Sequence, residues 1–156
     1  ACLTRVNNLC CQQIVSTKTF ESMTTGEKFD IYHHLNCRSR NVIYLGYCNL
    51  CQFTQYVGKS ELPVNLRINT HRNEVNSPTG GAFDKHFKTP GHSYNKNAIF
   101  ILIEQINSKQ MSKLETRALL EKREDFWMTR LKTISPHGFN DHINTNLSNQ
   151  IHSLCS

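Results

Sequence analysis

The chain has 156 residues and carries 18 Lys and Arg against 12 Asp and Glu, a formal net charge of +6. Its length fits one compact domain, and no apolar run approaches the roughly 18 residues of a membrane span, so we expect no membrane association. The basic balance makes nucleic acid a natural partner, although an ordinary basic surface fits it equally well. The start of the chain shows no signal peptide and no initiator Met, which suggests a piece of a longer polypeptide.

Seven Cys and eight His are unusually many for this length. An odd number of Cys cannot all pair in disulfides, and the mixture with His is more typical of metal binding than of a secreted, disulfide-bridged scaffold. The composition therefore indicates an intracellular zinc protein.

Residues 1–41 are poor in large apolar side chains and rich in Thr, Ser and Asn. Such a segment can bury little on its own, so we expect an N-terminal extension or linker that contains Cys and His. The character changes at Val42. Two β-prone runs, 42–47 and 53–58, predict a hairpin whose connection is 48–51.

The pattern turns helical after the hairpin. It predicts a helix over 63–75, a short helix over 82–88, a buried strand over 98–103 and a long helix over 112–132. This order predicts a small α+β domain over 42–140, in which a mainly antiparallel sheet of about three strands packs against helices. Residues 141–156 read as a polar C-terminal tail.

One carboxylate of the long helix falls within its apolar stripe. At about 100° per residue, Glu124 shares a face with Leu120 and Trp127. Burying an isolated charge costs several kcal/mol, so this side chain should be paired, metal-bound or catalytic. The structural alternative is an ion pair with Arg117 or Arg123.

Arg67 and His71 lie four residues apart and share one face of the first predicted helix. A guanidinium can bind a phosphate through two hydrogen bonds and an imidazole can move protons, so the pair suits phosphodiester chemistry. An exposed pair on a solvated helix face would have no such role. Positive charge for DNA binding is also available at Lys59, Arg72 and Arg123, or these are ordinary surface charges.

Cys48 and Cys51 stand at the predicted hairpin turn with the spacing of a zinc knuckle. His86 and His92 can complete a Cys2His2 set, because the turn at 90–91 folds the second His back toward the first. A zinc with four protein ligands has no open coordination position and stabilises the fold.

The remaining Cys and His residues allow two interpretations. They could form a second zinc site, although the neighbours Cys10 and Cys11 cannot easily bind the same ion, or they could be free thiols. The residues in question are Cys2, Cys10, Cys11, His33, His34 and Cys37, and Cys155 has no assigned role.

Two Tyr motifs on the predicted hairpin resemble the paired signature of the GIY-YIG endonucleases. Residues 42–44 read Val-Ile-Tyr, with Val in place of Gly, and residues 56–58 read Tyr-Val-Gly, with Val in place of Ile. The family's functional positions match in order at Tyr44, Tyr56, Arg67, His71, Glu124 and Asn140.

More narrowly, residues from about 33 to 140 resemble the endonuclease domain of Penelope-like retroelements. The resemblance lies in the segment Asn-Cys-x-Ser-x-Asn-Val-Ile-Tyr-Leu over 36–45, in the Cys pair inserted between the Tyr motifs, and in the downstream His pair. It assigns one structural zinc to Cys48, Cys51, His86 and His92.

The resemblance implies a metal-dependent DNA endonuclease that nicks duplex DNA by hydrolysing a phosphodiester. In this interpretation Glu124 holds one Mg²⁺ or Mn²⁺. Tyr44 accepts a proton from the attacking water, with help from Arg67 or His71. Tyr56 orients the water or phosphate, and Asn140 fixes the site's backbone. The nick would expose a 3′-hydroxyl as primer for target-primed reverse transcription, in a nuclear protein that also carries a reverse transcriptase. The alternative is a non-catalytic, zinc-stabilised nucleic-acid-binding module.

Overall fold

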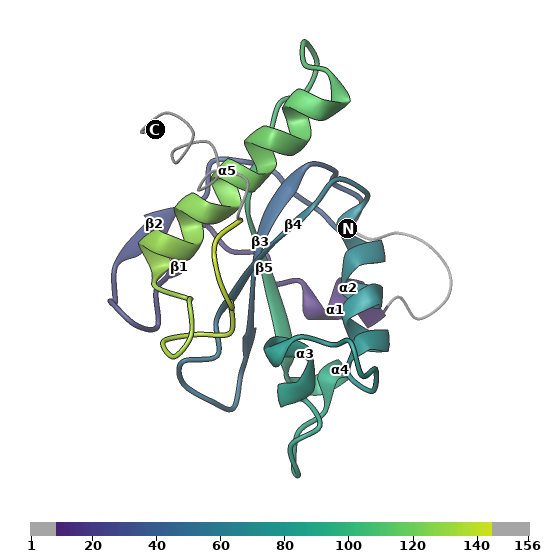
Figure 1. Ribbon diagram of the computed structural model, residues 1–156, viewed down its shortest axis with the longest axis vertical. Coiled ribbons are helices and arrows are strands. Elements are labelled where there is room, and N and C mark those ends of the chain that lie inside the picture. Colours follow the sequence, from purple (N-terminus) through teal and green to yellow (C-terminus); the bar gives the residue numbers. More distant parts are fainter. Residues whose placement is uncertain (1–8, 145–156) are drawn as a thin grey trace, which may run out of the picture.

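Three antiparallel strands form the central sheet of the molecule, in the order β4-β3-β5 (Figure 1). The computed structural model describes residues 9–144 of the chain. The strands are β3 (Val42–Cys48), β4 (Tyr56–Ser60) and β5 (Ala98–Gln105). The predicted small α+β fold, with a three-stranded antiparallel sheet against helices, is confirmed.

The two faces of β3 pack into separate hydrophobic cores. Tyr44 packs with Ile68 and Phe83 on one face, whereas Ile43 packs with Leu120 on the other. Successive side chains of a strand point to opposite faces, so a strand that is covered on both sides is apolar throughout instead of alternating. This double burial explains the continuous apolar run at the start of β3.

Helices cover both faces of the sheet. Figure 1 shows α5 with the β1–β2 hairpin on one side and α2, α3 and α4 on the other. The bounds are α2 (Val64–Glu74), α3 (Ala82–His86), α4 (Tyr94–Asn97) and α5 (Lys113–Leu131). Across residues 9–144, none of the helices combines the length and the apolarity needed to cross a membrane.

The long helix α5 has well-defined ends. The Ser112 hydroxyl accepts a hydrogen bond from the Glu115 backbone N–H at 3.1 Å, which caps the first turn. Lys132 ends the helix in the left-handed conformation, with φ of 51°. The predicted range 112–132 therefore equals this helix together with its two capping residues.

The start of β4 differs from the prediction, which placed the second run of the hairpin at 53–58. Phe53 has a positive φ of 57° and is 53% exposed. Thr54 instead folds back, and its hydroxyl accepts a hydrogen bond from the Cys48 backbone N–H at 3.0 Å. The connection is thus longer than predicted, and β4 begins only at Tyr56.

The N-terminal segment is part of the packed structure from residue 9 onward. It contains α1 (Leu9–Gln13) and a small sheet of β1 (Thr19–Glu21) and β2 (Lys28–Asp30). Phe20 is 4% exposed and its ring lies 5.2 Å from that of Trp127. An extension or linker was predicted here because apolar residues are few, but those present pack into both cores, Ile14 into the first and Phe20 into the second. Of the predicted tail 141–156, only 141–144 lie within the described residues.

Replacing Phe20 with Ala should lower the free energy of unfolding by about 3 kcal/mol, because it leaves a cavity between β1 and α5. Urea unfolding followed by circular dichroism measures this change. Tyr32→Ala is the matched control, since Tyr32 is 84% exposed and should cost little. Equal stability of the two variants would contradict the packing of the N-terminal segment against the domain.

Candidate active site and metal centre

The two Tyr motifs meet because β3 pairs with β4. In this register Tyr44 lies opposite Gly58. A Cβ atom at position 58 would overlap the ring and hydroxyl of Tyr44, so only glycine fits there. The Tyr-Val-Gly motif is therefore a steric requirement: its glycine makes room for the tyrosine of the other motif.

Both tyrosines are held as neutral phenols. Burial, followed by the neighbouring Tyr56, raises the pKa of Tyr44 well above 10, and Arg67 only partly opposes this. Burial likewise raises the pKa of Tyr56 to about 12, again against the effect of Arg67. Burial lowers the pKa of the Arg67 guanidinium, but its interactions with the two phenols outweigh this and the net shift is upward. The group thus combines two neutral hydroxyls with one fixed positive charge.

His71 connects Tyr44 to a carboxylate that the sequence did not single out. The Tyr44 hydroxyl lies 2.7 Å from His71 Nε2, and His71 Nδ1 lies 2.7 Å from Asp84 Oδ1. His71 is 2% and Asp84 4% exposed, so this line of hydrogen bonds is buried. Asp84 belongs to α3, thirteen positions beyond His71, and no local pattern links the two residues.

Glu124 is buried and paired, as its place in the apolar stripe predicted. Its Oε1 atom accepts hydrogen bonds from Lys59 Nζ at 3.1 Å and Asn144 Nδ2 at 3.0 Å. The two arginines predicted as alternative ion-pair partners of Glu124 are paired elsewhere, since Arg117 pairs with Glu61 and Arg123 with Glu104. The negative charge of Glu124 also helps to raise the pKa of both tyrosines, which places it in the same site.

Asn140 fastens the edge strand of the sheet. Its side-chain oxygen accepts a hydrogen bond from the Val57 N–H at 2.8 Å, and its amide donates to the Val57 carbonyl at 2.9 Å. The Thr133 hydroxyl donates to the same oxygen at 2.7 Å. The side chain thus replaces a neighbouring strand at β4 and fixes the backbone between Tyr56 and Gly58.

A shallow cavity of about 270 Å³ opens beside Arg67. Its lining includes Lys59 from β4 and the exposed side chains of Leu62 and Leu66. The cavity brings two cations to one opening, where an anionic ligand could reach them.

The two other predicted DNA-binding residues are engaged elsewhere. Arg72 donates to Asn95 Oδ1 at 2.7 Å and stacks over Tyr94. Arg123 lies 2.8 Å from Glu104 Oε2 and 4.3 Å above the Phe126 ring centroid. These contacts hold the fold together, and none of the four is made with Tyr44 or Tyr56.

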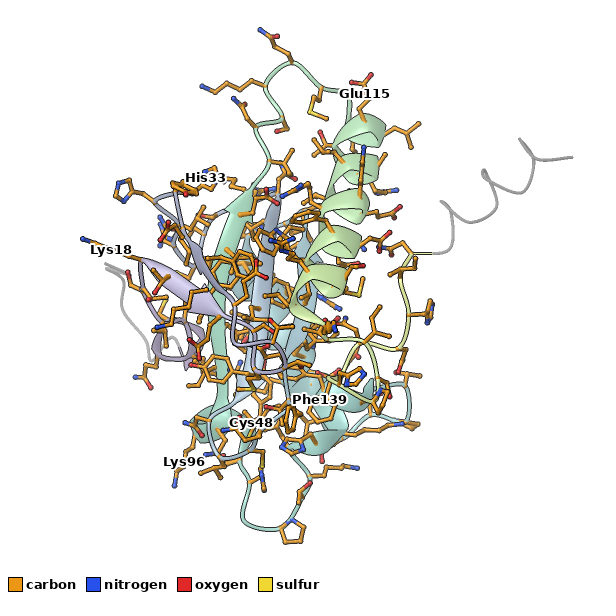
Figure 2. The ribbon with its side chains drawn as sticks, turned by 90° about the vertical axis from the view of Figure 1, so that its left-hand side faces the viewer. Lys18, His33, Cys48, Lys96, Glu115 and Phe139 are labelled. Atoms are coloured by element: carbon orange, nitrogen blue, oxygen red, sulfur yellow. The ribbon has the colours of Figure 1, made fainter. Side chains whose placement is uncertain are left out.

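The predicted Cys and His set comes together at the end of β3. The ligand atoms of Cys48, Cys51, His86 and His92 all lie within 4.8 Å of one another. Cys51 Sγ is 3.1 Å from His92 Nε2. Figure 2 shows Cys48 at the lower end of the molecule, far from Glu115 at the start of α5.

The chemistry of this cluster fits a zinc ion. His86 Nε2 is buried without a hydrogen-bond partner, which is costly unless a metal accepts its lone pair. Burial, and then His92, lowers the pKa of His86, which favours the neutral ligand form. Burial, with Cys51 nearby, raises the pKa of the Cys48 thiol, and a bound cation would offset this by stabilising the thiolate. The cluster can therefore hold a metal such as zinc.

A second zinc site stays a prediction. Cys11 on α1 and Cys37 before β3 bring their sulfur atoms to 2.9 Å. His33 and His34 line a separate cavity of about 540 Å³. Cys2, Cys155 and the side chain of Cys10 lie outside the described part of the structure.

Comparison of the chain with protein-family models, with curated proteins and with solved structures finds no match. The interpretation of the site therefore depends on its own residues and geometry.

Removal of zinc should destabilise the domain, since the ion would join the hairpin turn to α3 and the turn after it. Purified protein should contain about one zinc per chain, and chelation or Cys48→Ser should lower the melting temperature by roughly 10 °C. Elemental analysis and differential scanning calorimetry measure the two effects. His137→Ala, a change at an exposed His, should alter neither. Protein without zinc would contradict the assignment, and two zinc ions per chain would favour the second site.

Alkaline pH should destabilise the domain in part through Tyr56. Its pKa rises from 10.0 to about 12 on folding, so the folded state holds the phenol proton more tightly. The stabilisation is complete below pH 10.0 and is lost as pH rises to about 12. In Tyr56→Phe, the free energy of unfolding should depend less on pH over this window. The exposed Tyr32→Phe should keep the wild-type profile, and an unchanged profile in Tyr56→Phe would refute the shift.

Proposed function

We propose that the protein is a metal-dependent DNA endonuclease of the GIY-YIG type, which hydrolyses a phosphodiester and nicks duplex DNA. The observation that most supports this is the convergence of four groups from distant parts of the chain. Tyr44, Tyr56, Arg67 and Glu124 come from β3, β4, α2 and α5 and interact electrostatically at one edge of the sheet.

Phosphate binding is the task of Arg67 in this proposal. Its raised pKa keeps the guanidinium charged at all accessible pH values. The planar N–H donors match two phosphate oxygens and would stabilise the extra negative charge of the transition state. Tyr44 has no exposed surface, so side chains around it must move for water to reach its hydroxyl.

Glu124 would hold the catalytic Mg²⁺ or Mn²⁺. Its Oε1 atom carries both hydrogen bonds that the described residues form with this carboxylate, which leaves Oε2 as the atom for a cation. Lys59 neutralises the buried charge until the ion binds and can then contact the substrate phosphate. A hard divalent ion bound by one carboxylate and the phosphate would polarise a phosphate oxygen and stabilise the leaving alkoxide.

The hydrolytic step needs a proton acceptor for the attacking water. A neutral Tyr44 can accept that proton at its oxygen if it passes its own proton to His71 Nε2, 2.7 Å away. The water oxygen forms the new bond to phosphorus, and the bond from phosphorus to the 3′ oxygen breaks. The leaving alkoxide takes a proton from solvent, so the products are a 3′-hydroxyl and a 5′-phosphate.

Tyr56 would position the phosphate or the water next to Tyr44. Its ring stacks on Phe83 at 5.2 Å with an interplanar angle of 12°, and its edge meets His71. These contacts fix the ring, and Asn140 fixes the backbone that carries it. A preorganised hydroxyl loses little entropy when substrate binds.

With one such site, a single copy cleaves one strand per encounter. The resemblance to Penelope-like elements supports a role in target-primed reverse transcription, where the new 3′-hydroxyl would prime copying of an element's RNA by a fused reverse transcriptase in the nucleus.

Glu124→Gln should abolish nicking and leave duplex binding intact, because it removes one negative charge at the metal and keeps the shape of the side chain. The loss should be at least about 10³-fold. Conversion of supercoiled plasmid to open circles in Mg²⁺ measures cleavage, and fluorescence anisotropy with labelled duplex measures binding. Glu121→Gln removes the same charge one turn earlier on α5 and should nick normally.

Normal nicking by Glu124→Gln would refute the assignment of Glu124 as the ligand of the catalytic ion. Wild-type protein that binds duplex DNA but leaves plasmid intact with Mg²⁺ and with Mn²⁺ would favour the zinc-stabilised binding module instead.

A further inference from the structure

We propose that Asp84 is a positioning residue, whose carboxylate holds His71 in the one tautomer that can accept a proton from Tyr44. This inference rests on the proposed endonuclease function. Asp84 does not touch the substrate and acts only through His71, to which it is joined by the 2.7 Å hydrogen bond to Nδ1.

The chemistry of the partners fixes the direction of each hydrogen bond. A carboxylate offers only acceptors, so the hydrogen between His71 and Asp84 must sit on Nδ1. In a neutral imidazole the other nitrogen, Nε2, then carries a lone pair. The Tyr44 hydroxyl, 2.7 Å from Nε2, must therefore donate.

The surroundings of Tyr44 favour the same direction. The Arg67 guanidinium interacts with Tyr44 and has N–H donors only, so any hydrogen bond between them uses a lone pair of the phenol oxygen. The hydrogen of the hydroxyl is left for His71. Every proton position from Arg67 to Asp84 is thus consistent with transfer from Tyr44 to His71.

No other polar group competes for the His71 ring among residues 9–144. Its remaining neighbours are the rings of Tyr56, Phe83 and Phe100, which meet it at centroid distances of 5.5, 5.7 and 6.1 Å. A ring enclosed in this way cannot turn to solvent for an alternative partner. The choice between the two tautomers therefore depends on Asp84.

The transfer of a proton from water through Tyr44 to His71 leaves every bond and proton accounted for. The water proton bonds to the Tyr44 oxygen as the Tyr44 proton bonds to His71 Nε2, and the water oxygen bonds to phosphorus. The resulting imidazolium lies against the Asp84 carboxylate, which stabilises its charge. Since burial keeps Tyr44 a neutral phenol, a partner that accepts its proton is what allows it to act on water.

Asp84→Asn tests this role. An amide can donate to Nδ1, so His71 would carry its hydrogen on Nε2 and could no longer accept from Tyr44. The expected kcat for nicking falls on the order of 10³-fold, while duplex affinity stays unchanged. Long-range proton–nitrogen NMR on zinc-loaded, ¹⁵N-histidine-labelled protein reports the tautomer directly, with His71→Gln to assign the signals. His71 should be the Nδ1–H tautomer in wild type and the Nε2–H tautomer in Asp84→Asn.

Asp30→Asn, the same change at an exposed site, should alter neither the rate nor the spectrum. A wild-type His71 with its hydrogen on Nε2 overturns the proposal, even if Asp84→Asn fails to fold. Wild-type nicking rates in an Asp84→Asn protein with inverted tautomer overturn it too. If the wild-type protein does not nick at all, the endonuclease function fails, while the NMR tautomer still decides whether Asp84 sets the state of His71.

Discussion

The close approach of Tyr44 to Gly58 is the contact on which the site depends. It requires the antiparallel register of β3 and β4, and it fills the space that a side chain on β4 would take. Because the ring is locked there, its hydroxyl can meet His71 from α2 at 2.7 Å. Asn140 protects this arrangement from the outer side of β4 by satisfying the backbone groups of Val57. The edge strand is therefore rigid without a further strand beside it.

The burial of charge follows from the same architecture. The sheet separates a core around His71 from a second core under α5, and one partnered carboxylate is buried at each of them. Asp84 accepts from His71 in the first, and Glu124 accepts from Lys59 at the margin of the second. Both carboxylates are thereby placed at fixed positions, which is costly for folding, and the preorganised groups that result are what the proposed endonuclease function would require.

The predictable parts of the fold are those with a local signal. Periodicity and capping residues define α5, and the short spacing of Cys48 and Cys51 marks half of the metal cluster. Partners that meet only through tertiary packing leave no such pattern. Phe20 lies in a segment whose composition resembles a linker, yet it is one of the residues that complete a core. Asp84 and Asn144 reach His71 and Glu124 from other elements, and only the folded structure reveals them.

The five-residue helix α3 contributes one residue to the hydrogen bonds around His71 and another to the Cys and His cluster. It carries Asp84 in its interior and His86 at its end, so the hydrogen-bond acceptor of His71 and a residue of the Cys and His cluster share a single helical turn and a half. A segment this short has little rigidity of its own, and its orientation depends on the contacts of its residues, among them the buried Phe83 and Asp84. The contacts of His86 in the Cys and His cluster therefore bear on the position of Asp84, and through it on the imidazole inside the core.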